Sequence, residues 1–98
     1  MKLLDLLKAV KDKNLSKDQL EDYRDEMSSL YAEMQFELAD KRKEKAIYFI
    51  EHKLDSDKAT ERAWQATPSG LREIELSHYS KGTEKVLSSL KARLYQVY

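Results

Sequence analysis

Neither glycine nor proline occurs anywhere from Lys17 to Thr67. These two residues interrupt helices most strongly, at a cost of about 1 kcal/mol for glycine and about 3 kcal/mol for proline relative to alanine. Within the uninterrupted stretch the apolar residues recur with a helical period, not with the alternation of strands. The whole chain of 98 residues has two glycines and one proline, and 37% of it is charged. We therefore predict an all-α protein.

An apolar stripe of the coiled-coil type begins within this stretch. Its members recur at spacings of three and four residues: Leu20, Tyr23, Met27, Leu30, Met34 and Leu38. The spacing predicts one long helix over residues 17–53. Such a helix would be about 55 Å long, whereas a compact domain of this size has a diameter of about 35 Å. We therefore expect the helix to break, or the stripe to form the interface of a homo-oligomer.

Two recognisable caps mark where helices begin within this single domain, residues 1–98. Ser16 followed by Gln19 is a capping-box pattern. Thr67 precedes Pro68, which is favoured in the first turn of a helix. We predict an elongated helical hairpin or bundle. Its elements are a short docking helix at 1–13, the long helix at 17–53, a short helix at 56–66 and a C-terminal helix at 68–96.

The segment 40–53 changes character along its length, from four cations within five positions to aromatic and aliphatic residues. Four of its residues continue the sector of the apolar stripe: Lys41, Lys45, Tyr48 and His52. The apolar residues Ala46, Phe49 and Ile50 lie more than about 90° away on the helical wheel. Coiled-coil drift of about 20° per heptad cannot account for this difference. We therefore predict that the buried face of the helix changes near residue 40.

The cations of this segment have two interpretations. They form a solvated helix face, with Glu37 pairing to Lys41 one turn later, or they bind an anion such as a nucleic-acid backbone. In the second case Tyr48 and His52 could stack on bases. Trp64 would either extend that surface or anchor the core. The candidate nucleic-acid-binding residues are Lys41, Arg42, Lys43, Lys45, Tyr48, His52, Lys53, Lys58, Arg62 and Trp64.

The sequence lacks the residues that several classes of function require. There is no cysteine, and the two histidines do not have a zinc-binding spacing. No phosphate-binding loop or nucleophile motif is present. We expect a protein that is not an enzyme and has no metal, cofactor or small-molecule substrate. The short apolar run at the start contains Asp5 and predicts neither a signal peptide nor a membrane span, so we expect a cytoplasmic location with no membrane partner.

Two stretches resemble the small helical proteins of phage recombination modules and, more distantly, the UvsY-type recombination mediators. They read KAIYFIEHKLDSDKATERAWQATPSG at 45–70 and EKVLSSLKARLYQ at 84–96. The resemblance implies a ring-like helical oligomer that loads a recombinase onto single-stranded DNA in the host-cell cytoplasm. It also gives Lys91 and Arg93 a role on DNA, although both could be ordinary polar flanks of the Leu87, Leu90 and Leu94 stripe.

The charges favour no single partner class. The chain has 18 cationic and 18 anionic side chains, with a net charge of −4 over residues 1–40 and +4 over residues 41–98. Our leading hypothesis is a phage-type accessory protein that oligomerises and binds single-stranded DNA to assist recombination. The first alternative is a small phage-borne inhibitor or adaptor that binds a host or phage protein, because dedicated DNA binders are usually more basic. The second is a structural coiled-coil subunit.

Overall fold

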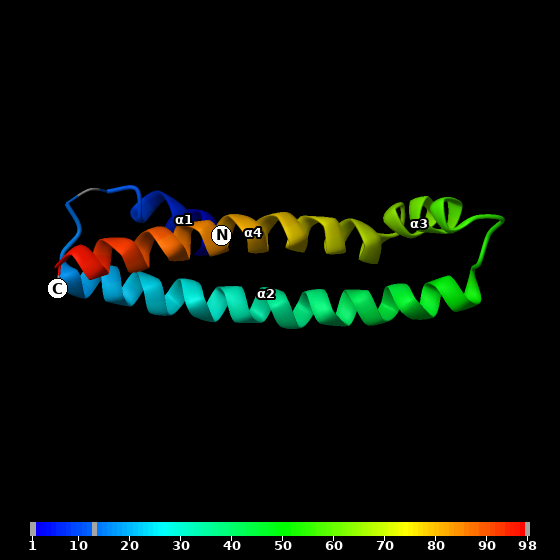
Figure 1. The fold of residues 1–98 in the computed structure, drawn as a ribbon, viewed down its shortest axis with the longest axis horizontal. Helices are drawn as coiled ribbons and strands as arrows, with labels where there is room; N and C mark the ends of the chain where they lie inside the picture. Colours follow the sequence, from blue (N-terminus) through cyan, green and yellow to red (C-terminus); the bar gives the residue numbers. More distant parts are fainter. Residues whose placement is uncertain (1, 13, 98) are drawn as a thin grey trace. The chain divides into compact units, whose positions relative to one another are not determined.

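The computed structural model describes residues 2–12 and 14–97, and over these residues the chain is helical and contains no strand. Figure 1 shows two long helices and two short ones. They are α1 (Lys2–Ala9), α2 (Lys17–Glu51), α3 (Asp57–Gln65) and α4 (Pro68–Val97). The prediction of an all-α fold with two long helices is confirmed.

Side-chain caps begin the helices where the sequence predicts them. Ser16 and Gln19 form a reciprocal capping box, with N···O distances of 2.9 and 3.2 Å. The Ser56 hydroxyl accepts a hydrogen bond from the Ala59 amide at 3.1 Å, and α3 starts at the next residue. The Thr67 hydroxyl accepts one from Gly70 at 3.0 Å. These bonds satisfy amide groups that a helix N-terminus leaves without an intrahelical partner.

The first helix is shorter than the predicted span of 1–13, of which residues 1 and 13 lie outside the described residues. It ends at Ala9, and the carbonyls that follow it are bound by Arg93 from α4. The Arg93 guanidinium donates to the Val10 oxygen and to the Asp12 oxygen, each at 2.6 Å. A positive group at the C-terminal end of a helix also complements the helix dipole. Arg93 therefore holds the end of α1.

Contacts within the chain divide it into two compact units, which we call unit 1 and unit 2. Unit 1 comprises the residues up to Glu33 and those from Ser80 onward, and unit 2 is Met34–Tyr79. Each long helix contributes one part to unit 1 and the other part to unit 2. Over the described residues, no helical stretch has the length and hydropathy that crossing a lipid bilayer requires.

The core of unit 1 is apolar and is built from α1, α2 and α4. Its buried members are Leu6, Val10, Leu20, Met27, Leu87, Leu90 and Leu94. Tyr23 and Leu30 pack against them and are partly buried. The leucines of α1 thus dock on the protein itself, which such a short helix requires for stability.

Unit 2 has a smaller apolar interior, centred on Leu38, Trp64 and Leu76, which are all buried. The first turn of α4 packs its backbone closely against the end of α3 at Gly70. A Cβ atom at this position would lie 1.9 Å from the Trp64 carbonyl oxygen. Only glycine permits this approach, so the connection depends on Gly70.

The apolar stripe predicted as an oligomer interface lies mostly inside the chain. Leu20, Met27 and Leu38 are buried by other parts of the same chain, and the other three members of the stripe are partly buried. The predicted interface required α2 to have no partner within the chain along much of its stripe. Because α1, α3 and α4 pack against it, the stripe requires no second subunit to cover it, and the homo-oligomer stays a prediction without this support.

Two buried hydroxyls of α4 differ in their hydrogen bonding from a buried hydroxyl of α3. Ser80 and Thr83 are buried, and their hydroxyl oxygens have no hydrogen-bond partner among the described residues. By contrast, the buried Thr60 hydroxyl accepts from the Leu54 amide at 3.0 Å and donates to the Ser56 oxygen at 3.1 Å. A buried polar group without a partner loses its hydration without compensation.

We predict that Thr83→Val stabilises the protein by about 1 kcal/mol, because the substitution keeps the shape and removes the unpaired hydroxyl. The matched control is Thr60→Val, which should destabilise it by about 1–3 kcal/mol because it leaves the Leu54 amide without its acceptor. Chemical denaturation followed by circular dichroism measures both. A destabilised Thr83→Val variant would show that this hydroxyl has a partner in solution.

Candidate interaction surface

The inward-facing sector of α2 continues past residue 40 without a change of face. Lys41, Lys45 and Tyr48 are half-buried and lie on the sector that Leu38 occupies one turn earlier. On the other side of the helix, Ala46 and Ile50 are exposed. The predicted change of buried face is therefore wrong. Phe49, predicted on the opposite face, is half-buried with the Lys45 ammonium 5.9 Å from its ring centre, and His52, predicted on the inner sector, is exposed. Lys45 and Tyr48 replace leucine on the inner face because they find partners on α3 and α4, whereas Lys41 pairs with Glu44 on α2 itself.

Lys45 is at the centre of these contacts. Its ammonium group lies 2.9 Å from a carboxylate oxygen of Glu61 on α3 and 3.9 Å from one of Glu73 on α4. Glu61 also accepts a hydrogen bond from Gln65 at 3.3 Å, and the lysine lies 5.9 Å from the ring centre of Phe49. One cation thus links three helices within unit 2. Lys45 is therefore paired within the fold, which argues against its assignment to a nucleic-acid surface.

The aromatic residues proposed to stack on bases are stacked on one another. The rings of Tyr48 and His52 are parallel, with centres 4.5 Å apart, and the Trp64 ring lies 5.5 Å from that of Tyr48. Trp64 is only 2% exposed, and its indole N–H donates to Glu73 at 2.9 Å. The interpretation of Trp64 as a core anchor is correct, and its assignment to a nucleic-acid surface is wrong.

A second ionic cluster joins α2 to α4. Arg72 binds both carboxylate oxygens of Glu37, at 2.6 and 2.9 Å, and also contacts Glu75. The hydrogen bonds from Arg72, more than its charge or that of Lys41, hold the pKa of Glu37 below its ordinary value of 4.5. Lys41 lies 3.5 Å from Glu44, so its ion pair runs forward along the helix and not back to Glu37 as expected. Partial burial of Glu37 raises its pKa and so opposes the effect of the hydrogen bonds from Arg72.

Five of the candidate nucleic-acid-binding cations remain exposed. None of them has an ion pair among the residues that the structure describes: Arg42, Lys43, Lys53, Lys58 and Arg62. They are mixed with carboxylates, and residues 34–79 contain eight Lys or Arg against nine Asp or Glu. Unit 2 therefore has no excess of positive charge to attract a polyanion.

The outward face of α2 in unit 2 has an apolar stripe that the sequence analysis did not identify. Phe36 is 75% exposed, Ile47 is 55% exposed and Ile50 is 82% exposed. The alanines Ala39 and Ala46 lie between them and are exposed too. We call these five residues, with the exposed Lys43, the outer stripe. The spacing of Phe36, Ala39, Lys43, Ala46 and Ile50 is 3, 4, 3 and 4, a signal that was visible in the sequence but is interrupted by a lysine.

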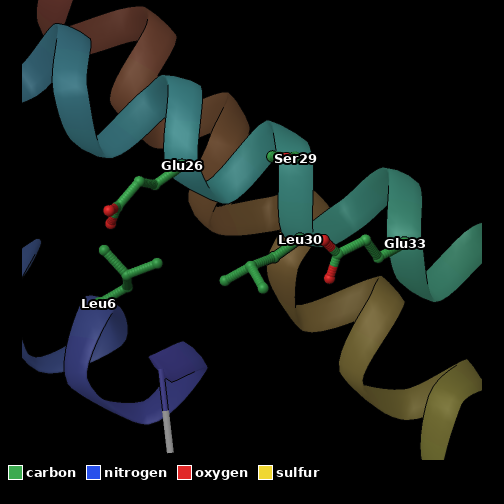
Figure 2. Close-up of a pocket in the computed structure, with 5 residues that line it drawn as sticks. All are labelled: Leu6, Glu26, Ser29, Leu30 and Glu33. Carbon is green, nitrogen blue, oxygen red and sulfur yellow. The ribbon is translucent and has the colours of Figure 1, made fainter.

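Unit 1 contains a small pocket between α1 and α2. Figure 2 shows Leu6 of α1 and Leu30 of α2 pointing toward one another, with the carboxylates of Glu26 and Glu33 on opposite sides of them. Ser29 completes the lining. Small-molecule sites bring a few polar groups together around an enclosed space. Here the carboxylates do not converge, so this pocket is a poor candidate for a binding site.

Comparison with known proteins adds no assignment: no family model, curated protein or solved structure matches this chain. The described residues also bring together no group of three histidine, aspartate or glutamate side chains that could hold a metal ion. The resemblance to phage recombination proteins therefore stays a prediction. Functional inference depends on the surfaces of the protein itself.

We predict that Lys45→Ala lowers the free energy of unfolding by about 1–2 kcal/mol, because it leaves the part-buried carboxylate of Glu73 beside that of Glu61 without a cation. The control is Lys58→Ala, an exposed lysine of α3 in the same unit, which should change stability by less than about 0.5 kcal/mol. Denaturant titration of both variants measures the difference. Equal losses of stability in the two variants would mean that the Lys45 ion pairs stabilise the protein no more than an exposed lysine does.

Proposed function

We propose that this protein is an interaction module that binds a helical protein segment through the outer stripe of α2. The observation behind the proposal is the exposure of Phe36 and Ile50, two large apolar side chains on the same face of a helix. Single exposed apolar residues are common on soluble proteins and need no explanation. An exposed apolar stripe with regular heptad spacing differs from such single residues. Helices use this spacing to pack along other helices, so the stripe indicates a helical partner.

The composition of the surface also supports a protein partner. The two clusters around Lys45 and Arg72 use their cations within the fold, and unit 2 has nearly balanced charge. Apolar and aromatic anchors at the centre of a patch with polar residues at its rim are typical of protein–protein interfaces. The alternative of an inhibitor or adaptor that acts by binding another protein is thus the one that the exposed surface supports best.

We expect Phe36→Ser combined with Ile50→Ser to abolish the capture of a protein partner by the immobilised chain, because these two residues contribute the largest exposed apolar side chains of the stripe. Leu71→Ser is the matched control, since Leu71 is 58% exposed on α4 in the same unit but lies outside the stripe. Capture is measured by pull-down after nuclease treatment, with circular dichroism to check that each variant is folded.

Two results of this experiment would contradict the proposal. One is capture that persists in the double variant, and the other is capture that is lost equally with Leu71→Ser. In either case the outer stripe would not be the binding surface.

Binding of single-stranded nucleic acid is a second candidate, favoured by the five exposed cations that lack ion pairs. Lys53 and Lys58 are the informative pair, because both are exposed and neither contacts a carboxylate in the described part of the chain. Assistance to recombination would follow from this activity in the manner that the resemblance implies. A structural coiled-coil subunit would use the outer stripe and would not require these lysines.

If the chain binds a labelled oligonucleotide, we predict that replacing Lys53 and Lys58 by Gln reduces the salt dependence of the affinity. The slope of log K against log salt should fall by about 1.4 units, since each phosphate contact on a single strand contributes about 0.7. The control is Lys45→Gln, which should leave the slope unchanged because Lys45 is paired within the fold. Absence of binding at low salt would exclude this second candidate.

A further inference from the structure

We infer that the partner of the outer stripe is a second copy of this chain, paired through α2 in an antiparallel orientation. The inference rests on the proposed function and names the occupant of the same surface. A second copy fits this surface because the stripe is complementary to itself in both size and charge.

Large and small residues alternate along the five members of the stripe that have the 3-4 spacing, and Ile47 lies beside this row. Phe36, Lys43 and Ile50 occupy one set of heptad positions, and Ala39 and Ala46 occupy the other. When two such helices run antiparallel, residues of one set lie opposite residues of the other. Phe36 then faces Ala46 of the second copy, and Lys43 faces Ala39. Ile50 faces the exposed Ala32 of the second copy, one turn before the stripe begins. Each layer holds one large and one small side chain, which permits close packing without voids.

A parallel pair would not fill the space in this way. Phe36 would face Phe36, and Ala39 would face Ala39 of the other copy, so that crowded layers would alternate with empty ones. Both defects destabilise packing. Lys43 would also lie directly against Lys43, with two like charges at the centre of the contact. The size pattern therefore favours the antiparallel orientation.

Charge complementarity supports the same register. Asp40 follows Ala39 by one residue, is exposed and has no ion pair among the described residues. With Lys43 packed against Ala39 of the second copy, its ammonium group lies beside Asp40 of that copy. The two-fold symmetry of the pair repeats the contact, which gives two intermolecular ion pairs. Lysine at such a position specifies register at some cost in stability.

The contact is small. From Phe36 to Ile50 the stripe extends about 21 Å along the helix axis at 1.5 Å per residue. Arg42, at the edge of the stripe, approaches Arg42 of the second copy near the two-fold axis. Solvent screens the repulsion between these two cations. Short interfaces are typical of weak or transient association. The dimer should therefore form at high protein concentration and dissociate on dilution.

The first test measures the mass of the full chain in solution over a dilution series. The wild-type mass should rise from 11.5 kDa toward twice that value as concentration increases. Phe36→Ser should remain monomeric over the whole range, whereas the control Leu71→Ser should behave as the wild type. A wild-type monomer at every concentration overturns this inference, and the pull-down described above then decides the proposed function separately. A dimer that Phe36→Ser does not weaken also overturns it.

The second test determines the orientation, and the absence of native cysteine makes it direct. Chains with Lys43→Cys are mixed with chains carrying Ala39→Cys under mild oxidation, which leaves Phe36 in place. The antiparallel pair places these two positions in one layer, so a disulfide should link the two kinds of chain. Ala46→Cys alone should not cross-link, because the two copies of residue 46 lie in different layers. Efficient cross-linking of Ala46→Cys to itself would overturn the antiparallel arrangement.

Discussion

Lys45 stands on the inner face of α2, and the packing of unit 2 depends on it. Its ammonium group lies against Glu61 of α3 and near Glu73 of α4, so a single cation joins three helices. Glu73 in turn accepts the indole N–H of Trp64, which is the largest buried side chain of this unit. Half-buried carboxylates are stabilised only when cations and donors compensate the loss of hydration. The inner face of α2 can therefore change from leucine to lysine without losing its contacts.

The two units use different interactions on the same pair of long helices. Unit 1 is held by an apolar core to which α1 contributes, with Arg93 binding the carbonyls at the end of that helix. Unit 2 has few buried apolar residues and uses ion pairs and aromatic contacts in their place. Because Lys41 and Lys45 occupy the inner face of α2, the apolar residues Phe36, Ile47 and Ile50 remain on its outer face. The proposed binding surface is thus a consequence of how the interior is built.

Much of the fold could be predicted from local features of the sequence. The absence of glycine and proline from Lys17 to Thr67 specified α2 and α3 as helices, and the caps at Ser16 and Thr67 specified where α2 and α4 begin. These are contacts between residues a few positions apart, and they depend little on the rest of the chain. The site was predicted less well. Lys41, Lys45, Tyr48 and Trp64 were expected on a contact surface and instead contact other residues of unit 2.

The sequence by itself determined that the chain is all-α, since helix propensity, capping and heptad spacing are local properties. Only the tertiary structure decided which face of α2 is buried between Met34 and Glu51. An apolar pattern identifies the faces that could be buried, but the partners of Lys45 come from residues 16 and 28 positions further along the chain. The ion pairs with Glu61 and Glu73 made the charged face the inner one. Phe36 and Ile50 were left on the outer face for this reason.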